Sequence, residues 1–148
     1  MMDLLTGGCA CRAVRYTLRA TPYDTGWCHC RLCQRSSGAP AVVFTTIGVA
    51  DFSISQGAPA TWRSSRFGER GFCAACSSLL TIRVDFQPDT IDIAAATLDR
   101  PEIVAPGFHI FCEDAIRWAL LDDGLPRHAQ WRPETRGLEP GRGDTVPP

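Results

Sequence analysis

Seven of the eight cysteines lie in three short clusters, and their spacing limits what this chain can fold into more than any other feature. In an extended segment, residues i and i+2 point to the same side and lie about 6.6 Å apart, so both sulfurs of a C-x-C motif can face one ion. A C-x-x-C turn brings two sulfurs around one tetrahedral zinc, with Zn–S bonds of about 2.3 Å. Seven thiols divide most simply into a closed four-thiolate site and a three-thiolate site with one position open for chemistry. The clusters are Cys9-Ala-Cys11, Cys28-His-Cys30-Arg-Leu-Cys33 and Cys73-Ala-Ala-Cys76.

An even number of cysteines is also typical of the disulfide framework of a small secreted protein. However, the segment from Met1 to Cys9 has neither a basic region nor an apolar run long enough for a signal peptide. The usual spacings of ferredoxin ligands are also absent, which disfavours an iron–sulfur cluster. We therefore predict that the clustered cysteines bind metal rather than form disulfides, in a reducing, cytoplasmic environment.

The composition is typical of one globular domain. The chain has 148 residues, of which 45% are hydrophobic and 21% charged, enough to bury an ordinary core. With a formal net charge of −1, the chain has no overall basic field, and we expect no binding to nucleic acid. No apolar stretch approaches the roughly 18 residues of a membrane span, so we expect no membrane partner.

Most segments alternate apolar and polar residues with the period of a half-buried strand. Val14, Tyr16 and Leu18 alternate with polar neighbours in this way. Many short strands separated by turns predict a mostly β, antiparallel domain over residues 4–128. Residues 129–148 are predicted to be a tail, rich in Pro and Gly. Further strands are predicted at 41–46, 52–55, 60–64, 70–72, 79–84 and 90–95, with a short helical stretch at 113–121 and another helical turn after Cys33.

The order of the clusters suggests how they pair. Cys9 and Cys11 precede the first predicted strand, and Cys73 and Cys76 lie between two later strands, so one zinc joining them would tie the N-terminal edge to the middle of the sheet. The central cluster supplies three ligands within six residues and is the candidate reactive site. Spacing alone also allows Cys73 and Cys76 to join two thiols of the central cluster.

With these clusters, the chain resembles the glutathione-dependent formaldehyde-activating family, zinc proteins that share a domain with centromere protein V. The resemblance covers about Leu4 to His128 and implies a β-tent fold of short antiparallel sheets. One residue departs from the pattern: Ser77 follows the last C-x-x-C, where Gly is usual, so either Ser77 has a positive φ or the turn is relaxed. The resemblance implies a structural zinc on Cys9, Cys11, Cys73 and Cys76 and a catalytic zinc on Cys28, Cys30 and Cys33. The matching text is Gly-Gly-Cys-Ala-Cys at 7–11, Cys-His-Cys-Arg-Leu-Cys-Gln-Arg-Ser-Ser-Gly at 28–38, Phe-Cys-Ala-Ala-Cys at 72–76, His-Ile-Phe at 109–111 and Trp118.

The implied activity is that of a carbon–sulfur lyase that adds the thiol of glutathione to formaldehyde, giving S-hydroxymethylglutathione. A zinc with three cysteinates carries a net charge of −1, which suits it to holding a thiolate better than to generating hydroxide. Arg31 and Arg35 lie inside the motif and are predicted to bind the carboxylates of glutathione through forked hydrogen bonds. Two other functions stay open: a zinc-stabilised binding module without catalysis, and an enzyme acting on another small thiol.

Three further residues have weaker predictions. The side chain of His29 should point away from the metal, with a supporting or surface role. His109 lies in an apolar segment and is more often a hydrogen-bonded structural residue than a ligand or general acid. Cys112, outside the clusters, is predicted to be a buried thiol that packs as a small apolar residue.

Overall fold

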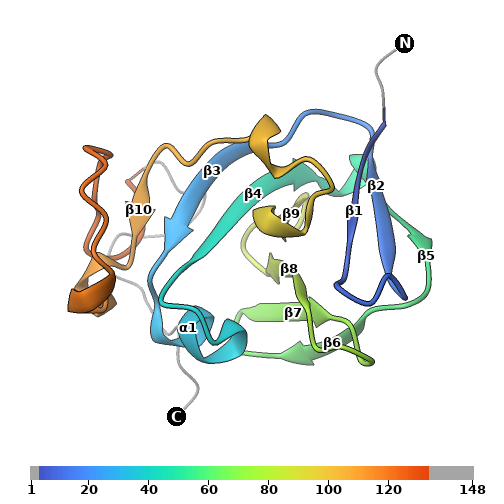
Figure 1. Ribbon diagram of the computed structural model, residues 1–148, viewed down its shortest axis with the longest axis horizontal. Helices are drawn as coiled ribbons and strands as arrows, with labels where there is room; N and C mark the ends of the chain where they lie inside the picture. Colours follow the sequence, from blue (N-terminus) through green and yellow to red (C-terminus); the bar gives the residue numbers. More distant parts are fainter. Residues whose placement is uncertain (1–3, 134–148) are drawn as a thin grey trace.

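Two β-sheets form the framework of the chain, which the computed structural model describes over residues 4–133 (Figure 1). The three-stranded sheet has the order β1 (Leu5–Gly8), β2 (Arg15–Leu18) and β5 (Phe52–Gln56). The seven-stranded sheet has the order β10 (His109–Ile110), β3 (Tyr23–Cys28), β4 (Val42–Gly48), β9 (Thr90–Ala94), β8 (Leu79–Val84), β7 (Gly68–Phe72) and β6 (Ala60–Arg63). All pairs of these strands are antiparallel except β10 with β3. The predicted mostly β fold of short, folded antiparallel sheets is confirmed.

One α-helix, α1 (Arg31–Ser37), begins directly after Cys30. The Cys30 sulfur accepts a hydrogen bond from the Cys33 N–H and caps the helix, and Gly38 ends it with a φ of 72°. A left-handed residue is a common helix terminator, and glycine adopts it without a steric penalty. The remaining helical turns are 3-10 turns at Val49–Asp51, Ala95–Thr97, Pro101–Ile103, Cys112–Asp114 and Arg117–Ala119.

The short helical stretch predicted over residues 113–121 forms only as separate turns. Two separate 3-10 turns occupy this region. Trp118 is 79% exposed and Leu120 and Leu121 are also exposed, so the segment buries no apolar stripe that would stabilise a longer helix.

Strand β3 escaped sequence analysis because its alternation is interrupted. Asp24 has a φ of 49°, and the register with β4 shifts between Tyr23 and Gly26. Gly26 is required by close packing, since a Cβ there would lie 2.2 Å from a ring carbon of Phe108. Strand β1 was also missed, because its sequence Leu-Thr-Gly-Gly has little β propensity.

The main hydrophobic core lies between the two sheets. Tyr16 and Leu18 of β2 pack there with Ile47 of β4, Leu80 of β8 and Ile93 of β9, and each of these residues is at most 1% exposed. Burying an aliphatic side chain of this size contributes about 1.5–3 kcal/mol relative to leaving it in water. One face of the central strands therefore packs in the core.

The opposite face of the same strands is available for a site. Successive residues of a strand point to opposite faces. Since Ile47 and Ile93 face the core, Phe44 and Thr46 of β4 and Asp92 of β9 face the other side. Thr46 and Asp92 are direct cross-strand partners, as are Phe44 and Ala94.

The chain after β10 returns to the sheet. The Phe111 N–H donates to the Gln130 carbonyl at 3.0 Å, and the rings of Phe111 and Trp131 meet edge-on with centroids 5.0 Å apart. The described part of the predicted tail, residues 129–133, thus contacts the domain, whereas residues 134–148 lie outside the described chain. The division at residue 128 stays a prediction. Within residues 4–133, no helix has both the length and the apolar character needed to cross a membrane.

Candidate functional site

Four cysteines from two distant turns form the first cluster. Cys9 and Cys11 lie in the turn between β1 and β2, and Cys73 and Cys76 lie in the turn between β7 and β8. Their sulfur atoms all lie within 4.8 Å of one another. The Cys9–Cys11 and Cys11–Cys73 sulfur separations are 3.6 Å and 3.8 Å. Sulfurs bonded tetrahedrally to zinc at about 2.3 Å would be about 3.8 Å apart, so this set fits a closed metal site.

Backbone geometry supports this cluster. Ser77 has a φ of 64°, and its N–H donates to the Cys73 carbonyl at 2.8 Å, so the turn keeps the left-handed form without glycine. The Ser78 hydroxyl accepts a hydrogen bond from the Ala10 N–H at 3.0 Å and lies 3.1 Å from the Cys76 sulfur. Ser78 therefore joins the two turns directly, and the structure does not form the alternative pairing with the central cluster.

The second cluster lies where β3 meets α1. Cys28 ends the strand, Cys30 caps the helix and Cys33 lies in its first turn, and all three are buried. Their sulfurs lie within 4.8 Å of one another, with 3.5 Å between Cys28 and Cys33. All eight cysteines fall in the described chain and none forms a disulfide. Three sulfurs at these separations fit three corners of a tetrahedral metal site with one corner left open.

The three sulfurs also stabilise negative charge. Hydrogen bonds from the Cys28 and Cys33 thiols lower the pKa of Cys30 to about 3 against the opposing effect of burial, and the charge of Arg70 contributes in the same direction. The hydrogen bonds to Cys30 and burial raise the pKa of the Cys28 and Cys33 thiols. Cysteines bind a metal as thiolates, so metal binding at this cluster would release protons.

Arg70 of β7 brings a buried positive charge to this cluster. The residue is 2% exposed, and one terminal nitrogen donates to the Cys33 sulfur at 3.2 Å. The other donates to the Ser64 hydroxyl at 2.6 Å, and Nε has no hydrogen-bond partner within the described chain. Because burying an unpaired cation is costly, the cysteine cluster is the natural counter-charge for Arg70.

Two buried histidines support the back of the cluster. His29 Nε2 lies 2.8 Å from His109 Nδ1, and His109 Nε2 lies 2.9 Å from a carboxylate oxygen of Asp123. Burial lowers the pKa of His29, and the neighbouring His109 adds to this effect. His29 is buried rather than on the surface, and His109 is a hydrogen-bonded residue outside the sulfur cluster. The pair connects the loop of the second cluster with β10 and the segment around Asp123. Cys112 is partly buried, and desolvation raises the pKa of its thiol.

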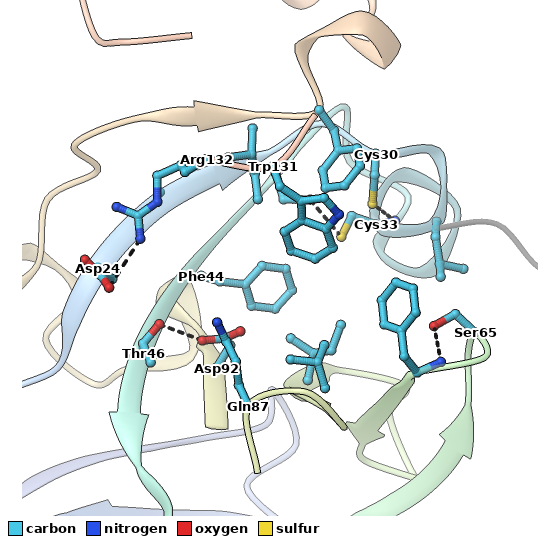
Figure 2. Close-up of a pocket in the computed structure, with 18 of the residues that line it drawn as sticks. Asp24, Cys30, Cys33, Phe44, Thr46, Ser65, Gln87, Asp92, Trp131 and Arg132 are labelled. Atoms are coloured by element: carbon cyan, nitrogen blue, oxygen red, sulfur yellow. Dashed lines mark hydrogen bonds and ion pairs between the residues drawn. The ribbon is translucent and has the colours of Figure 1, made fainter. Parts of the chain in front are cut away.

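A cavity of about 140 Å³ opens beside the second cluster. The three cysteines and Arg70 line it. Figure 2 shows Cys30 and Cys33 at one end of the cavity. Figure 2 shows Asp92, Thr46 and Gln87 on the side away from Cys30 and Cys33, with Arg132 paired to Asp24 nearby. Aromatic side chains also line the cavity: Phe44, Phe67, Phe108, Phe111 and Trp131. No cysteine of the first cluster lines this cavity.

Comparisons with known proteins identify the family. The model of the family described as "Glutathione-dependent formaldehyde-activating enzyme" matches residues 4–114, which are 111 of the 148 residues. The chain belongs to this family. A Halomonas elongata protein provisionally named a glutathione-dependent formaldehyde-activating enzyme is 28% identical over 161 residues, covering 93% of this chain and 99% of that protein. The crystal structure of a Rhodobacter sphaeroides protein has a TM-score of 0.56 and 22% identity, covering 83% of this chain and 98% of that chain. This second likeness shows a shared fold.

In this family member, the structure does not place the two predicted arginines in the cavity. Arg31 and Arg35 are exposed on α1 and do not line the cavity beside the cysteines. The Arg31 guanidinium hydrogen-bonds the Gln34 side chain. Their role as carboxylate-binding residues stays a prediction.

Sequence reasoning missed four side chains that line the cavity: Arg70, Asp92, Trp131 and Arg132. Asp92 carried a signal, since it is a carboxylate between two isoleucines in a predicted strand and so faces the side opposite to theirs. Arg70 carried a similar signal, because it is a charged residue in the strand predicted at 70–72. Trp131 and Arg132 had none, because only tertiary packing brings the end of the described chain back to the sheet.

Proposed function

We propose that this protein binds glutathione through its sulfur beside Cys28, Cys30 and Cys33 and adds that thiol to formaldehyde. In this reaction a carbon–sulfur bond forms between the thiol sulfur and the carbonyl carbon. The carbonyl π bond breaks, and the thiol proton ends on the carbonyl oxygen to give S-hydroxymethylglutathione. The protein would be a cytoplasmic carbon–sulfur lyase-type enzyme. The observation that carries the proposal is that the three-cysteine cluster, with one metal position to spare, opens onto a cavity lined by Arg70 and aromatic residues.

The two cysteine clusters have different proposed roles. Cys9, Cys11, Cys73 and Cys76 would hold a structural zinc, because four sulfur ligands complete a tetrahedral site. Cys28, Cys30 and Cys33 would hold the catalytic zinc. When bound there, zinc would supply a Lewis acid that lowers the pKa of the substrate thiol below its free value of about 8.5.

The residues around the open site suit an anionic sulfur nucleophile. With zinc held by three cysteinates, a bound substrate thiolate would add a fourth negative charge, and the buried guanidinium of Arg70 would offset one of the four. The aromatic walls exclude water, which leaves the thiolate poorly solvated and more reactive toward a carbonyl. Arg70 and the walls therefore contribute both binding and activation.

Calorimetry on the zinc-loaded protein tests the sulfur contact. If the sulfur is bound as thiolate at pH 7, glutathione binding should release close to one proton, measured in two buffers with different ionisation enthalpies. S-methylglutathione keeps both carboxylates but cannot form a thiolate, so we expect it to bind at least about tenfold more weakly. Equal affinity without proton release would show that sulfur does not reach the cluster.

A rate measurement separates the enzyme from a binding module. Thiols add to formaldehyde spontaneously, so adduct formation must be measured above the uncatalysed background with and without protein. Glutathione binding with proton release but no acceleration would favour a zinc-stabilised binding module. Acceleration with a different thiol and not with glutathione would change the substrate while keeping the site.

A further inference from the structure

A buried hydrogen-bond network lies behind the second cluster and has no role in the chemistry proposed above. The network runs from Asp123 through His109 to His29. His29 lies between Cys28 and Cys30 in the sequence. His109 is fully buried and His29 is 2% exposed, whereas the Asp123 side chain is 30% exposed. Neither histidine lines the cavity, so the network connects the loop of the second cluster to the protein surface by a separate route.

The carboxylate of Asp123 sets the direction of the hydrogen bonds in this network. A carboxylate only accepts hydrogen bonds, so His109 Nε2, 2.9 Å away, carries a proton and donates it to the bond. In a neutral imidazole the other ring nitrogen is then an acceptor. When both rings are neutral, His109 Nδ1 therefore accepts from His29 Nε2 at 2.8 Å. Asp123 thus fixes the position of the proton on both rings.

Further contacts hold Asp123 and His109 in place. The Leu125 N–H donates to Asp123 Oδ1 at 3.1 Å, which orients the carboxylate. The His109 N–H donates to the Pro126 carbonyl at 2.8 Å. The His109 ring stacks on Trp27 with centroids 6.1 Å apart and planes inclined by 9°. His109 therefore has little freedom to turn, and its hydrogen bond to His29 has a fixed direction.

The position of the His29 ring is coupled to the positions of two sulfurs. Cys28 ends β3, and Cys30 has a φ of −59° and a ψ of 147°, so the backbone on either side of His29 is extended. In an extended segment, the side chain of one residue points opposite to those of both neighbours. A rotation of this segment that moved the His29 ring would therefore also move the sulfurs of Cys28 and Cys30.

The geometry points to a positioning role: we propose that Asp123 acts through His109 and His29 to hold the loop of the second cluster in the geometry that binds zinc. This inference rests on the zinc site of the proposed function, and it assigns a role to a residue that does not itself line the cavity. Residues that orient metal ligands from outside the coordination sphere typically contribute about 10–100-fold to metal affinity.

Zinc affinity of Asp123 variants of the full-length protein tests the role. Asp123→Ala removes the acceptor, and we expect the zinc affinity of the second cluster to fall about tenfold. Asp123→Asn keeps an oxygen acceptor of the same shape and should recover most of this loss. Asp122→Asn removes the neighbouring exposed carboxylate and is the matched control, with zinc affinity expected to equal that of the wild type. Competition with a chromophoric chelator measures both clusters, and the first cluster should keep its affinity in every variant.

Nitrogen-15 NMR of the histidine rings adds a readout that a merely stabilising role would not change. The chain has three histidines, so single substitutions can assign the signals. At pH 8, where an ordinary histidine is neutral, we expect the wild type to carry the proton on Nε2 of both His29 and His109. In Asp123→Ala the acceptor of His109 is lost, and we expect a mixture of the two tautomers at that ring.

The possible outcomes separate this inference from the proposed function. Unchanged zinc affinity of the second cluster in Asp123→Ala would overturn the positioning role and leave zinc binding intact. An equal loss at both clusters would also overturn it, because general destabilisation would be the cause. Tautomers that stay the same in Asp123→Ala would show that the carboxylate does not set them. A wild type without zinc at the second cluster would reject the proposed function itself. If Asp123→Ala does not fold, Asp123→Asn should still show a smaller loss confined to the second cluster.

Discussion

Arg70 shows how one residue links the fold to the proposed chemistry. It is buried on β7, yet its terminal nitrogens contact a hydroxyl and a sulfur rather than a carboxylate. A guanidinium in this position contributes stability only while an anion lies beside it, because an unpaired buried charge is strongly destabilising. Arg70 and the three cysteines are therefore expected to depend on each other energetically.

Replacing Arg70 tests this dependence. Arg70→Gln removes the charge and keeps a hydrogen-bonding side chain, and we expect zinc affinity of the central cluster to fall about 10–100-fold, the usual cost of losing a partner of a metal ligand. Arg70→Lys restores the charge without the fork and should recover part of the loss. Competition with a chromophoric chelator measures both variants. The first cluster is an internal control, and unchanged affinity at the central cluster would show that Arg70 does not support it.

At the scale of single elements, the turn after β7 carries local strain. Ser77 has a φ of 64°, a conformation that costs a residue with a side chain about 1–2 kcal/mol and that glycine adopts freely. The four-cysteine cluster and the hydrogen bonds of the turn hold Ser77 in this form. A substitution at Ser77 can therefore relieve this backbone strain without changing any cysteine of the cluster.

We predict that Ser77→Gly raises stability modestly, by up to about 1 kcal/mol once the greater flexibility of glycine in the unfolded chain is subtracted. Ser77→Ala is the matched control, because it removes the hydroxyl but keeps the Cβ and the strained φ. Urea denaturation of the zinc-loaded variants measures both. If alanine stabilised the protein as much as glycine, the hydroxyl rather than the backbone would be responsible.

The strands differ in how well the amino-acid sequence alone predicts them. Strands β2 and β9 each turn alternate apolar residues onto the core, so a period of two was enough to predict them. Strand β3 depends on a positive φ at Asp24 and on a glycine that admits the Phe108 ring, and neither constraint is visible before packing is known. The cysteines were predictable from spacing, whereas the cavity residues depend on strand register and on residues 131 and 132 folding back.

At the scale of the whole molecule, the two clusters tie together different amounts of chain. The first joins the β1–β2 turn of the three-stranded sheet to the β7–β8 turn of the seven-stranded sheet, and the sulfurs of Cys11 and Cys73 are 62 residues apart in sequence. The second spans only Cys28 to Cys33. Constraining a longer loop removes more entropy from the unfolded chain.

Two cysteine variants should therefore behave in opposite ways. Cys73→Ser should lower the melting temperature clearly and reduce the free energy of unfolding by several kcal/mol, since binding energy at a structural zinc is folding energy. Cys30→Ser should release one zinc per chain with a small change in melting temperature, because serine is also a good helix N-cap and can keep the contact to the Cys33 N–H. Metal analysis beside thermal melts followed by circular dichroism measures both.

A Cys73→Ser variant with the melting temperature of the wild type would contradict the structural role of the first cluster. Loss of both zinc ions or global unfolding in Cys30→Ser would make the central cluster structural and contradict the proposed enzyme.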